Sequence, residues 1–403
     1  MMSDTASQSD TLATAKTSRR RALGALAGGG LAAGVAAALP ISAFALETTS
    51  VPPALAVGNT SPFSYQLEKS APEAYAGGTI QTATIKNIES LVGLSIAILV
   101  VNPGAVREIH WHPNAGELNY CLDGTGTIGV LSSTGESATF ALAPGTIAFM
   151  PIGDAHYIRN SGADPLKLLI GFSHEHVSNQ TFSETLPWVP ADLLNQTLGV
   201  PAGTFPLIAP RGDLAIVDIQ ADAADPAGSA STAFSTHVDK LVVQNFTGGT
   251  VQPVRVAAIP RLEGMTLLKL DIDVAAIREP HWHGNASEFN YCASGTAQVG
   301  IVSPAGESWT FTIEPGDVAY IPKNWFHYIA AAGDQPVLIL AFFDAIAPSR
   351  IDLTAMTTFF PPDVLAASFS IDPAIFASLP HQGTVVIAGP IAKDANPIAT
   401  PST

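Results

Sequence analysis

Short apolar runs bounded by turn residues recur along most of the chain. Residues 94–101 and 336–343 are two such runs, rich in branched side chains and flanked by Gly, Pro, Asp or Asn. Runs of this length and punctuation predict β-strands. Strands at this density, separated by glycines such as Gly124 and Gly145, predict an antiparallel sheet that is closed or sandwiched. We therefore expect an all-β fold.

Two later stretches have a different pattern and predict short helices. Residues 186–198 and 357–369 each contain Pro followed by Asp-Leu-Leu or Asp-Val-Leu, with spaced apolar positions beyond. Proline is favoured where a helix begins because its missing N–H costs nothing there. We expect one helix to begin near Pro190 and another near Pro361, each after a group of strands.

The whole pattern occurs twice. Shifting the chain on itself by 171 positions, which places His110 on His281, keeps the register from about residue 62 onwards without a gap. A repeat of this length is an ordinary domain. We expect domains at residues 46–211 and 232–385, followed by a tail at 386–403. The Ala- and Asp-rich stretch 212–231 is interpreted as an exposed linker.

Residues 1–45 are typical of an export signal. Arg19-Arg20-Arg21 resembles a twin-arginine pattern, an Ala/Gly/Leu stretch follows, and Ala43-Phe44-Ala45 places small residues at the cleavage site. An uncleaved anchor is the alternative, but glycines 28–30 and many alanines would span a membrane poorly. We expect a secreted or periplasmic mature chain without stable membrane insertion.

Net charge and cysteine content limit the kinds of partner and of cross-link that we expect. The net charge of −16 argues against nucleic acid, because neutralisation of phosphates dominates that kind of binding. Cys121 and Cys292 occupy equivalent positions of the repeat. We interpret them as small buried core residues; a bridge between them would require the two equivalent strands to touch.

Each domain contains three histidines and one glutamate in the same order and at the same spacing. These are His110, His112, Glu117 and His156 in the first domain, and His281, His283, Glu288 and His327 in the second. Alternate side chains of a strand share a face, so His-x-His presents both imidazoles to the same side. Such a set predicts one metal ion in each domain.

The ligand types restrict the metal. Nitrogen and oxygen ligands without a thiolate favour six-coordinate Mn(II) or Fe(II) over a closed tetrahedral zinc site. Four protein ligands on an octahedral ion leave two positions for a bidentate dicarboxylate, or for one substrate oxygen with O₂ or water.

An arginine precedes each His pair by three positions, Arg107 in the first domain and Arg278 in the second. On a regular strand this spacing turns the arginine away from the histidine face, unless a β-bulge re-aims it. An arginine on the histidine face would be the expected partner of a substrate carboxylate, because its planar fork binds carboxylates through two hydrogen bonds.

The motifs around these residues resemble those of the cupin superfamily. Residues 104–124 match Gly-x5-His-x-His-x3-4-Glu-x6-Gly, and residues 145–160 match Gly-x5-Pro-x-Gly-x2-His-x3-Asn. The second copy departs at Val274, Asn324 and Ala331, where the patterns have Gly, Gly and Asn. The string Arg-Glu-x-His-Trp-His, present in both copies, resembles the bicupins of the oxalate decarboxylase family.

The resemblance implies two tandem cupin barrels, of the double-stranded β-helix or jelly-roll type, with short helices after each. It implies a Mn-dependent enzyme that converts oxalate to formate and CO₂ with O₂ as co-reactant, in which Arg107 and Arg278 bind the carboxylate. It also implies a homo-oligomer.

The chain departs from that family at the proton donor. The family's lid reads Ser-Glu-Asn-Ser-Thr, whereas residues 177–181 place Ser178, Asn179 and Gln180 in the middle, without a glutamate. Ala341 stands where decarboxylases have a second glutamate. Glu175, in a polar His-Glu-His stretch that the second copy replaces by Ala-Ile-Ala, is the candidate general acid.

This asymmetry predicts that the first domain performs the chemistry. Oxalate oxidase, which yields peroxide and CO₂, is the nearest alternative because the lid glutamate is missing. Another cupin dioxygenase or a non-enzymatic storage cupin are further alternatives. The storage class commonly loses metal ligands, and here all eight are intact.

Overall fold

The computed structural model describes residues 61–206, 208, 215–219, 233–379 and 385–389. Residues 52–403 belong to one compact unit. The expected export signal, most of the expected linker and most of the tail lie outside the described residues.

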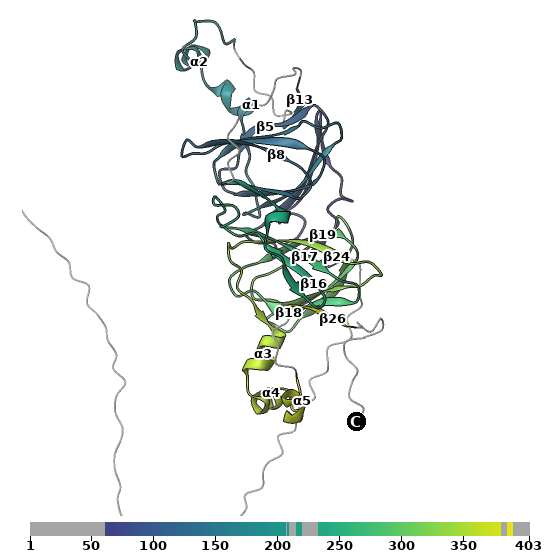
Figure 1. The fold of residues 1–403 in the computed structure, drawn as a ribbon. Helices are drawn as coiled ribbons and strands as arrows, with labels where there is room; N and C mark the ends of the chain where they lie inside the picture. Colours follow the sequence, from purple (N-terminus) through teal and green to yellow (C-terminus); the bar gives the residue numbers. More distant parts are fainter. Residues whose placement is uncertain (1–60, 207, 209–214, 220–232, 380–384, 390–403) are drawn as a thin grey trace, which may run out of the picture. The chain divides into compact units, whose positions relative to one another are not determined.

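Thirteen strands build or border the first barrel. They are β2 Glu73–Tyr75, β3 Gly78–Ala83, β4 Ser95–Val101, β5 Ala105–Trp111, β6 Glu117–Asp123, β7 Gly126–Leu131, β8 Ser137–Leu142, β9 Thr146–Met150, β10 Ala155–Asn160, β11 Leu166–Phe172, β12 Gln180–Thr181, β13 Ile216–Asp218 and β14 Ser235–His237. One sheet has the order β14-β9-β6-β11-β4-β3-β2, and the other β12-β5-β10-β7-β8 with β13 beside β5. All of these pairings are antiparallel. Figure 1 shows the first barrel as the body that carries the labels β5 and β8.

The second barrel repeats this plan. Its strands are β1 Ser64–Tyr65, β15 Gln244–Phe246, β16 Gly249–Pro253, β17 Thr266–Ile272, β18 Ala276–Trp282, β19 Glu288–Ser294, β20 Ala297–Val302, β21 Ser308–Ile313, β22 Val318–Ile321, β23 Phe326–Ala331, β24 Val337–Phe343, β25 Ile351–Asp352 and β26 Val386–Ala388. The sheets run β1-β22-β19-β24-β17-β16-β15 and β21-β20-β23-β18-β25, with β26 beside β18. The predicted all-β class is confirmed, and β4 and β24 match the two predicted strands.

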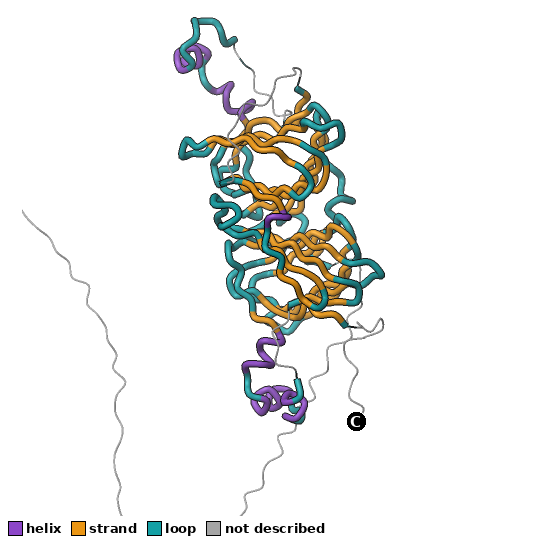
Figure 2. Tube along the Cα trace, viewed as in Figure 1, coloured by secondary structure: helices purple, strands orange, loops and turns teal. Residues whose placement is uncertain are grey.

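Short helices follow the strands of each barrel and appear in purple in Figure 2. They are α1 Phe182–Thr185, η1 Leu186–Trp188 and α2 Ala191–Thr197 after the first barrel, and α3 Leu353–Phe359, α4 Pro362–Phe369 and α5 Pro373–Ala377 after the second, with η2 Val238–Lys240 between. Pro190 and Pro361 are the N-cap residues of α2 and α4. The predicted helix starts are therefore confirmed. The patterns predict no helix at α1, α3 or α5: α1 and α5 have four and five residues, too few to show a helical period, and α3 begins without the proline that marks α2 and α4.

The two barrels exchange their first strands. β1 pairs with β22 of the second barrel, Ser64 facing Ala319, and β14 pairs with β9 of the first, Ser235 facing Ala148. Phe63 lies in the core of the second barrel, 4.9 Å from the ring of Trp309 between centroids. Burial of an aromatic side chain in the partner barrel couples the two halves mechanically.

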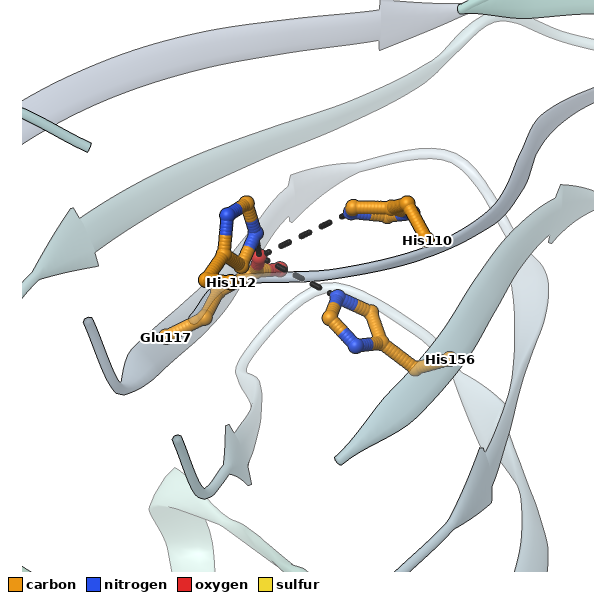
Figure 3. Close-up of side chains that lie close together, drawn as sticks. All are labelled: His110, His112, Glu117 and His156. Atoms are coloured by element: carbon orange, nitrogen blue, oxygen red, sulfur yellow. Dashed lines mark hydrogen bonds and ion pairs between the residues drawn. The ribbon is translucent and has the colours of Figure 1, made fainter. Parts of the chain in front are cut away.

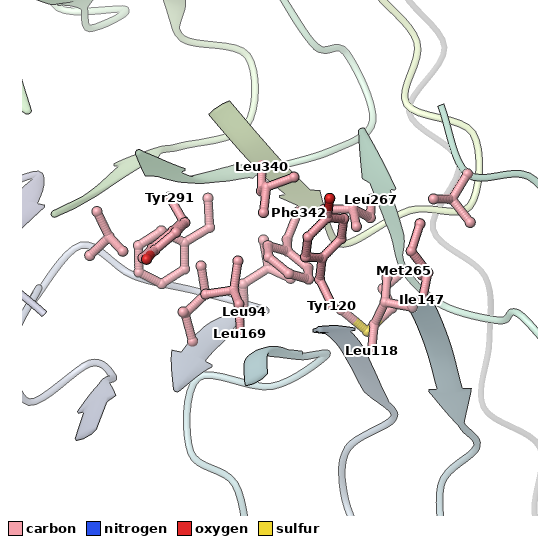
Figure 4. Packing of buried hydrophobic residues seen from close by; sticks show 14 of the residues in the cluster. Leu94, Leu118, Tyr120, Ile147, Leu169, Met265, Leu267, Tyr291, Leu340 and Phe342 are labelled. Atoms are coloured by element: carbon pink, nitrogen blue, oxygen red, sulfur yellow. The ribbon is translucent and has the colours of Figure 1, made fainter. Parts of the chain in front are cut away.

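A third hydrophobic core, shared by both barrels, lies between them (Figure 4). Leu118 and Tyr120 from the first barrel pack in the same cluster as Leu267 and Phe342 from the second. At Gly171 an added Cβ would lie 2.2 Å from the Phe342 ring, so a side chain there would clash. This close packing makes the two halves one folding unit rather than two independent domains.

Two short segments differ from the expected exposed connections. Ile216–Asp218, inside the expected linker, forms β13 against β5, and Val386–Ala388, at the start of the expected tail, forms β26 against β18. Ile216 and Val386 are fully buried in the cores of their barrels. Three residues are too few to show a strand period, whereas the free edge of a neighbouring strand supplies hydrogen bonds and burial.

Both cysteines are buried and free, as expected. Burial raises the pKa of each thiol to about 12, so neither is reactive at neutral pH. Within the described residues, no helix combines the length and apolar character needed to cross a bilayer.

Candidate metal centres and substrate pocket

The four expected ligands of the first barrel meet at one point (Figure 3). His110 lies on β5, His112 directly follows this strand, Glu117 begins β6 and His156 lies on β10. One ligand atom from each lies within 4.8 Å of the others, and all four residues are buried. The two sheets of the barrel thus bring together residues 46 positions apart at most.

Backbone carbonyl groups orient each imidazole. The Nδ1 atoms of His110, His112 and His156 lie 2.7, 3.1 and 2.9 Å from the carbonyl oxygens of residues 108, 178 and 154. A carbonyl oxygen only accepts, so each Nδ1 carries the proton and each Nε2 presents a lone pair. The Nε2 atoms of His112 and His156 lie 2.7 and 3.2 Å from Glu117 Oε2.

This arrangement fits a cation. Burial lowers the pKa of His110 and favours the neutral imidazole. Burial also raises the pKa of Glu117, but charge and hydrogen-bond interactions with His156 and His112 outweigh it and hold the pKa well below its usual value. Asn119 Nδ2 donates to Glu117 Oε1 over 2.8 Å. Three imidazole lone pairs and one carboxylate oxygen that converge in a buried site suit a divalent ion such as Mn(II) or Fe(II).

The second barrel contains the equivalent centre. The atoms of His281, His283, Glu288 and His327 also lie within 4.8 Å of one another and are buried. The Nδ1 atoms of the three histidines each lie 2.8 Å from a backbone carbonyl oxygen, those of residues 279, 349 and 325. The sequence repeat is therefore also a repeat of metal-site geometry, and the eight expected ligands form two clusters of four.

A β-bulge re-aims the arginine of the first barrel. β10 pairs with β5 so that His156 faces His110 while Ile158 faces Arg107, which places one extra residue in β5. Arg107 and His110 therefore both lie on the inner face, and Arg107 is 5% exposed. The same bulge separates Arg278 from His281 in the second barrel. Regular alternation would have pointed these arginines outward.

The first metal cluster opens into a large cavity. Its volume is about 470 Å³, and its walls include Arg107, three of the metal ligands and apolar residues such as Phe172. The Nη1 atom of Arg107 donates to the Ala215 carbonyl over 3.0 Å. Within the described part of the chain, Arg107 forms no ion pair with a carboxylate, so its remaining N–H groups can bind an anion.

The second cavity is far smaller, about 50 Å³. Arg278 also lines it, but its Nη2 atom donates to Asp352 Oδ1 over 2.8 Å. Leu268 lies in its wall where the first cavity has Ala97. The two metal centres are alike, whereas the space beside them is not.

The expected lid residues contact the end of β5 and the first cavity. The Ser178 carbonyl accepts from His112, Asn179 lines the cavity, and the Gln180 side chain accepts a hydrogen bond from Trp111 Nε1 over 2.8 Å. β12, which begins at Gln180, pairs with the end of β5. The lid is thus held against the strand that carries His110 and leads into His112.

Glu175, the expected general acid, is placed elsewhere. Its carboxylate accepts a hydrogen bond from the Gly93 backbone N–H over 2.9 Å, and Glu175 is absent from the cavity wall. That hydrogen bond lowers its pKa, which opposes proton donation. The structure gives Glu175 a role in holding the loop rather than in contacting substrate.

A different glutamate, Glu184, reaches the cavity. Glu184 lies on α1 and lines the wall, and its carboxylate accepts a hydrogen bond from Thr181 Oγ1 over 3.0 Å. Its matched position in the second copy is Ala355. The same comparison of the two copies that selected Glu175 could have found Glu184, but the position of α1 over the cavity was not visible in the sequence.

The chain is similar to known proteins of one family. The cupin family model matches residues 65–202 and again 238–375. Among curated relatives, an oxalate decarboxylase of Bacillus subtilis is 24% identical over 302 residues, covering 73% of this chain and 78% of the relative. A probable oxalate decarboxylase of Arthroderma benhamiae is 23% identical over 337 residues, covering 81% and 82%.

A solved structure of the Bacillus subtilis oxalate decarboxylase has the same fold. It superimposes with a TM-score of 0.75 at 21% identity, and the match covers 84% of this chain and 90% of that one. The two family matches together span more than half of the chain, one for each barrel. The chain therefore belongs to the cupin family and is a bicupin similar to the oxalate decarboxylases.

Proposed function

We propose that this protein is a Mn(II)-dependent enzyme that converts oxalate to formate and CO₂ at the metal centre of its first barrel. The observation that carries the proposal is the buried Arg107, without a carboxylate partner in the described chain, in the same cavity as the metal ligands His110, His112 and Glu117. The cavity holds a cationic fork and a metal site side by side, which suits a small dianion.

The relatives support the substrate and the metal. Two curated relatives bear the name oxalate decarboxylase or probable oxalate decarboxylase, and Mn(II) centres are described for the Bacillus subtilis enzyme. The N₃O donor set suits Mn(II), with Fe(II) as the second candidate. When bound, the ion supplies a Lewis acid and a one-electron carrier, with O₂ as co-reactant.

The residues of the cavity position and isolate the substrate. Arg107 binds one carboxylate of oxalate through its fork and holds the dianion beside the metal ligands. Ile170 and Phe172 provide apolar wall that excludes water from the reacting carbon. The apolar surroundings that these two side chains provide strengthen the electrostatic interaction between the guanidinium of Arg107 and the substrate.

Formation of formate needs a proton. When the carbon–carbon bond breaks, oxalate (C₂O₄²⁻) and one H⁺ give HCO₂⁻ and CO₂, and the carbon that stays behind must receive that proton. We assign its donation to Glu184, since this carboxyl group lines the cavity and is held by Thr181. Without a donor, O₂ would accept two electrons and oxalate with two H⁺ would give two CO₂ and H₂O₂, the oxidase outcome.

Product analysis tests the proposal. Metal-loaded protein is incubated with oxalate in air, and formate, peroxide and CO₂ are measured. We expect formate and CO₂ in equal amounts with little peroxide. Glu184→Gln should lower formate and raise the share of peroxide, while Glu175→Gln, the matched control, should keep the original product ratio. Peroxide as the main product of the unaltered protein would make it an oxidase, and no consumption of oxalate would refute both.

The helical segments support a homo-oligomer. Trp188 at the end of η1 is 82% exposed and Phe359 at the end of α3 is 81% exposed. Large exposed aromatic side chains are typical of contact surfaces, and here one lies on the helical segment after each barrel. We propose that copies of this chain associate through these helices. Light scattering after chromatography should show an oligomer that Phe359→Glu dissociates; a monomeric unaltered protein would rule the proposal out.

We also propose that the mature protein is exported. The twin-arginine pattern and the small residues before position 46 support this. Expression with and without residues 1–45, followed by fractionation, tests it. Retention of the full chain in the cytoplasm would refute it.

A further inference from the structure

The two cavities differ at two matched positions that bear charge in the second copy only. Asp352 stands where the first barrel has Thr181, and Arg350 stands where it has Asn179. Thr181 and Asp352 lie on the short strands β12 and β25, and Asn179 and Arg350 directly precede these strands. The metal ligands are the same in the two copies, so the difference concerns only what lies beside the metal.

Asp352 occupies the anion-binding face of the second arginine. Its Oδ1 atom accepts from Arg278 Nη2 over 2.8 Å, and its Oδ2 atom accepts from Arg350 Nε over 2.9 Å. The side chains of Arg278 and Asp352 are 7% and 12% exposed. The Nη1 atom of Arg278 donates to the Val385 carbonyl over 3.1 Å. Both ends of this guanidinium are therefore bonded, and its charge is compensated.

The backbone places this carboxylate next to the metal site. β25 pairs with β18 so that Asp352 faces the metal ligand His281. Asp352 is also the N-cap residue of α3, yet its side chain makes no capping hydrogen bond. An aspartate at this position ordinarily caps its own helix. Here the carboxylate turns instead to the arginine beside the metal.

We propose that Asp352 is a built-in carboxylate that takes the place of a substrate anion, so that Asp352 and Arg350 close the second metal centre to dicarboxylates. A dianion would have to displace a buried ion pair and would leave Asp352 with Arg350 as its single partner, which is unfavourable. Substrate specificity thus differs between two nearly identical metal sites. The inference rests on the proposed function only for the choice of oxalate as the dianion.

Steric filling supports the same conclusion. The second cavity measures about 50 Å³ and the first about 470 Å³. Leu268 replaces Ala97 in its wall, and Arg350 is also part of this wall. A metal-bound dicarboxylate needs room for its second carboxylate, which only the first cavity offers.

Binding stoichiometry tests the closure without relying on turnover. Mn-loaded protein is titrated with oxalate under argon by calorimetry, and the Mn(II) spectrum is recorded by electron paramagnetic resonance. We expect one oxalate per two Mn(II) and perturbation of half of the signal. In Arg107→Gln, binding at the first site weakens, so any remaining stoichiometric binding reports on the second. The closed second site should bind none.

Variants that open the second site to oxalate give the most direct test of the closure. Asp352→Thr with Arg350→Asn copies the first barrel, and adding Leu268→Ala copies its wall. In the Arg107→Gln background these changes should create one oxalate site, with affinity at least about 100-fold above that of the parent. Two Mn(II) per chain and an unchanged circular dichroism spectrum show that the variant is folded. Asp352→Asn, which keeps the shape but removes the charge, should give an intermediate gain.

The outcomes separate this inference from the proposed function. Two oxalate molecules bound by the unaltered protein, or none gained by the folded opened variants, would overturn the closure. If the unaltered protein bound no oxalate, the proposed function would fail. The same titration with formate would then test whether the second site is closed to anions. The proposal requires that only the opened variants bind formate at the second site.

Discussion

Replacing each of the two arginines by glutamine should have opposite effects on turnover and stability. Arg107 donates to one backbone carbonyl and forms no ion pair in the described structure, so Arg107→Gln should change the free energy of unfolding by about 1 kcal/mol or less. The variant loses two charge-assisted hydrogen bonds to the substrate carboxylate. These contribute together about 3–5 kcal/mol, so kcat/KM should fall by about 10²- to 10⁴-fold.

Arg278→Gln is the matched control in the second barrel. Removing Arg278 leaves Asp352 buried beside Arg350 alone. Loss of one partner of a buried ion pair costs about 3–5 kcal/mol, and the remaining contact with Arg350 favours the lower end. Because the two barrels form one folding unit of about 300 described residues, a loss of about 3 kcal/mol lowers the melting temperature by about 5 °C. Turnover per folded molecule should stay within about threefold of the unaltered protein, a change of less than about 1 kcal/mol.

The assay compares steady-state formate production with thermal unfolding for both variants at equal Mn(II) content. The expected pattern is an inactive, stable Arg107→Gln and an active, destabilised Arg278→Gln. Equal loss of kcat/KM in both variants would refute the assignment of chemistry to the first barrel. A destabilised Arg107→Gln would show that Arg107 is a structural residue, and the reasoning from its missing ion partner would fail.

Three further predictions concern the metal, pH and the shared core. Elemental analysis should find two Mn(II) per chain, and chelation should lower the unfolding free energy by about 2.7 kcal/mol for each site that had been held at 100 times its Kd; material without a transition ion would contradict the metal centres. The pKa values of His110 and Glu117 are lower in the folded protein than their ordinary values of 6.5 and 4.5. The metal-free protein should therefore lose stability as the pH falls from each ordinary value towards the lowered pKa. Above neutral pH these two groups should not change the stability. His110→Gln should flatten the melting-temperature profile below pH 6.5, and an unchanged profile would argue against this assignment. Phe342→Ala should cost about 3–5 kcal/mol, because the side chain is fully buried in the core that both barrels share; both halves should then unfold together in urea at a lower midpoint, and a separate transition of one barrel would contradict the shared core.

Local patterns account for what could be predicted of the fold. The strands β4 and β24 are runs of adjacent apolar residues, and the starts of α2 and α4 are marked by proline. Such signals depend on neighbouring residues only, so they can be read without the tertiary structure. The strands β13 and β26 have three residues each and form because a partner edge is present. Exchange of β1 and β14 between the barrels also depends on contacts far apart in the chain.

The amino-acid sequence by itself determined the metal centres. His-x-His on a strand forces two imidazoles onto one face, and the repeat of the spacing at His110 and His281 makes the set too regular for chance. The tertiary structure alone decided the direction of Arg107, the place of Glu175 away from the cavity, and the presence of Glu184 in its wall. These depend on a bulge and on how a short helix packs over a barrel. Pairwise contacts of that kind leave no periodic trace in the order of the residues.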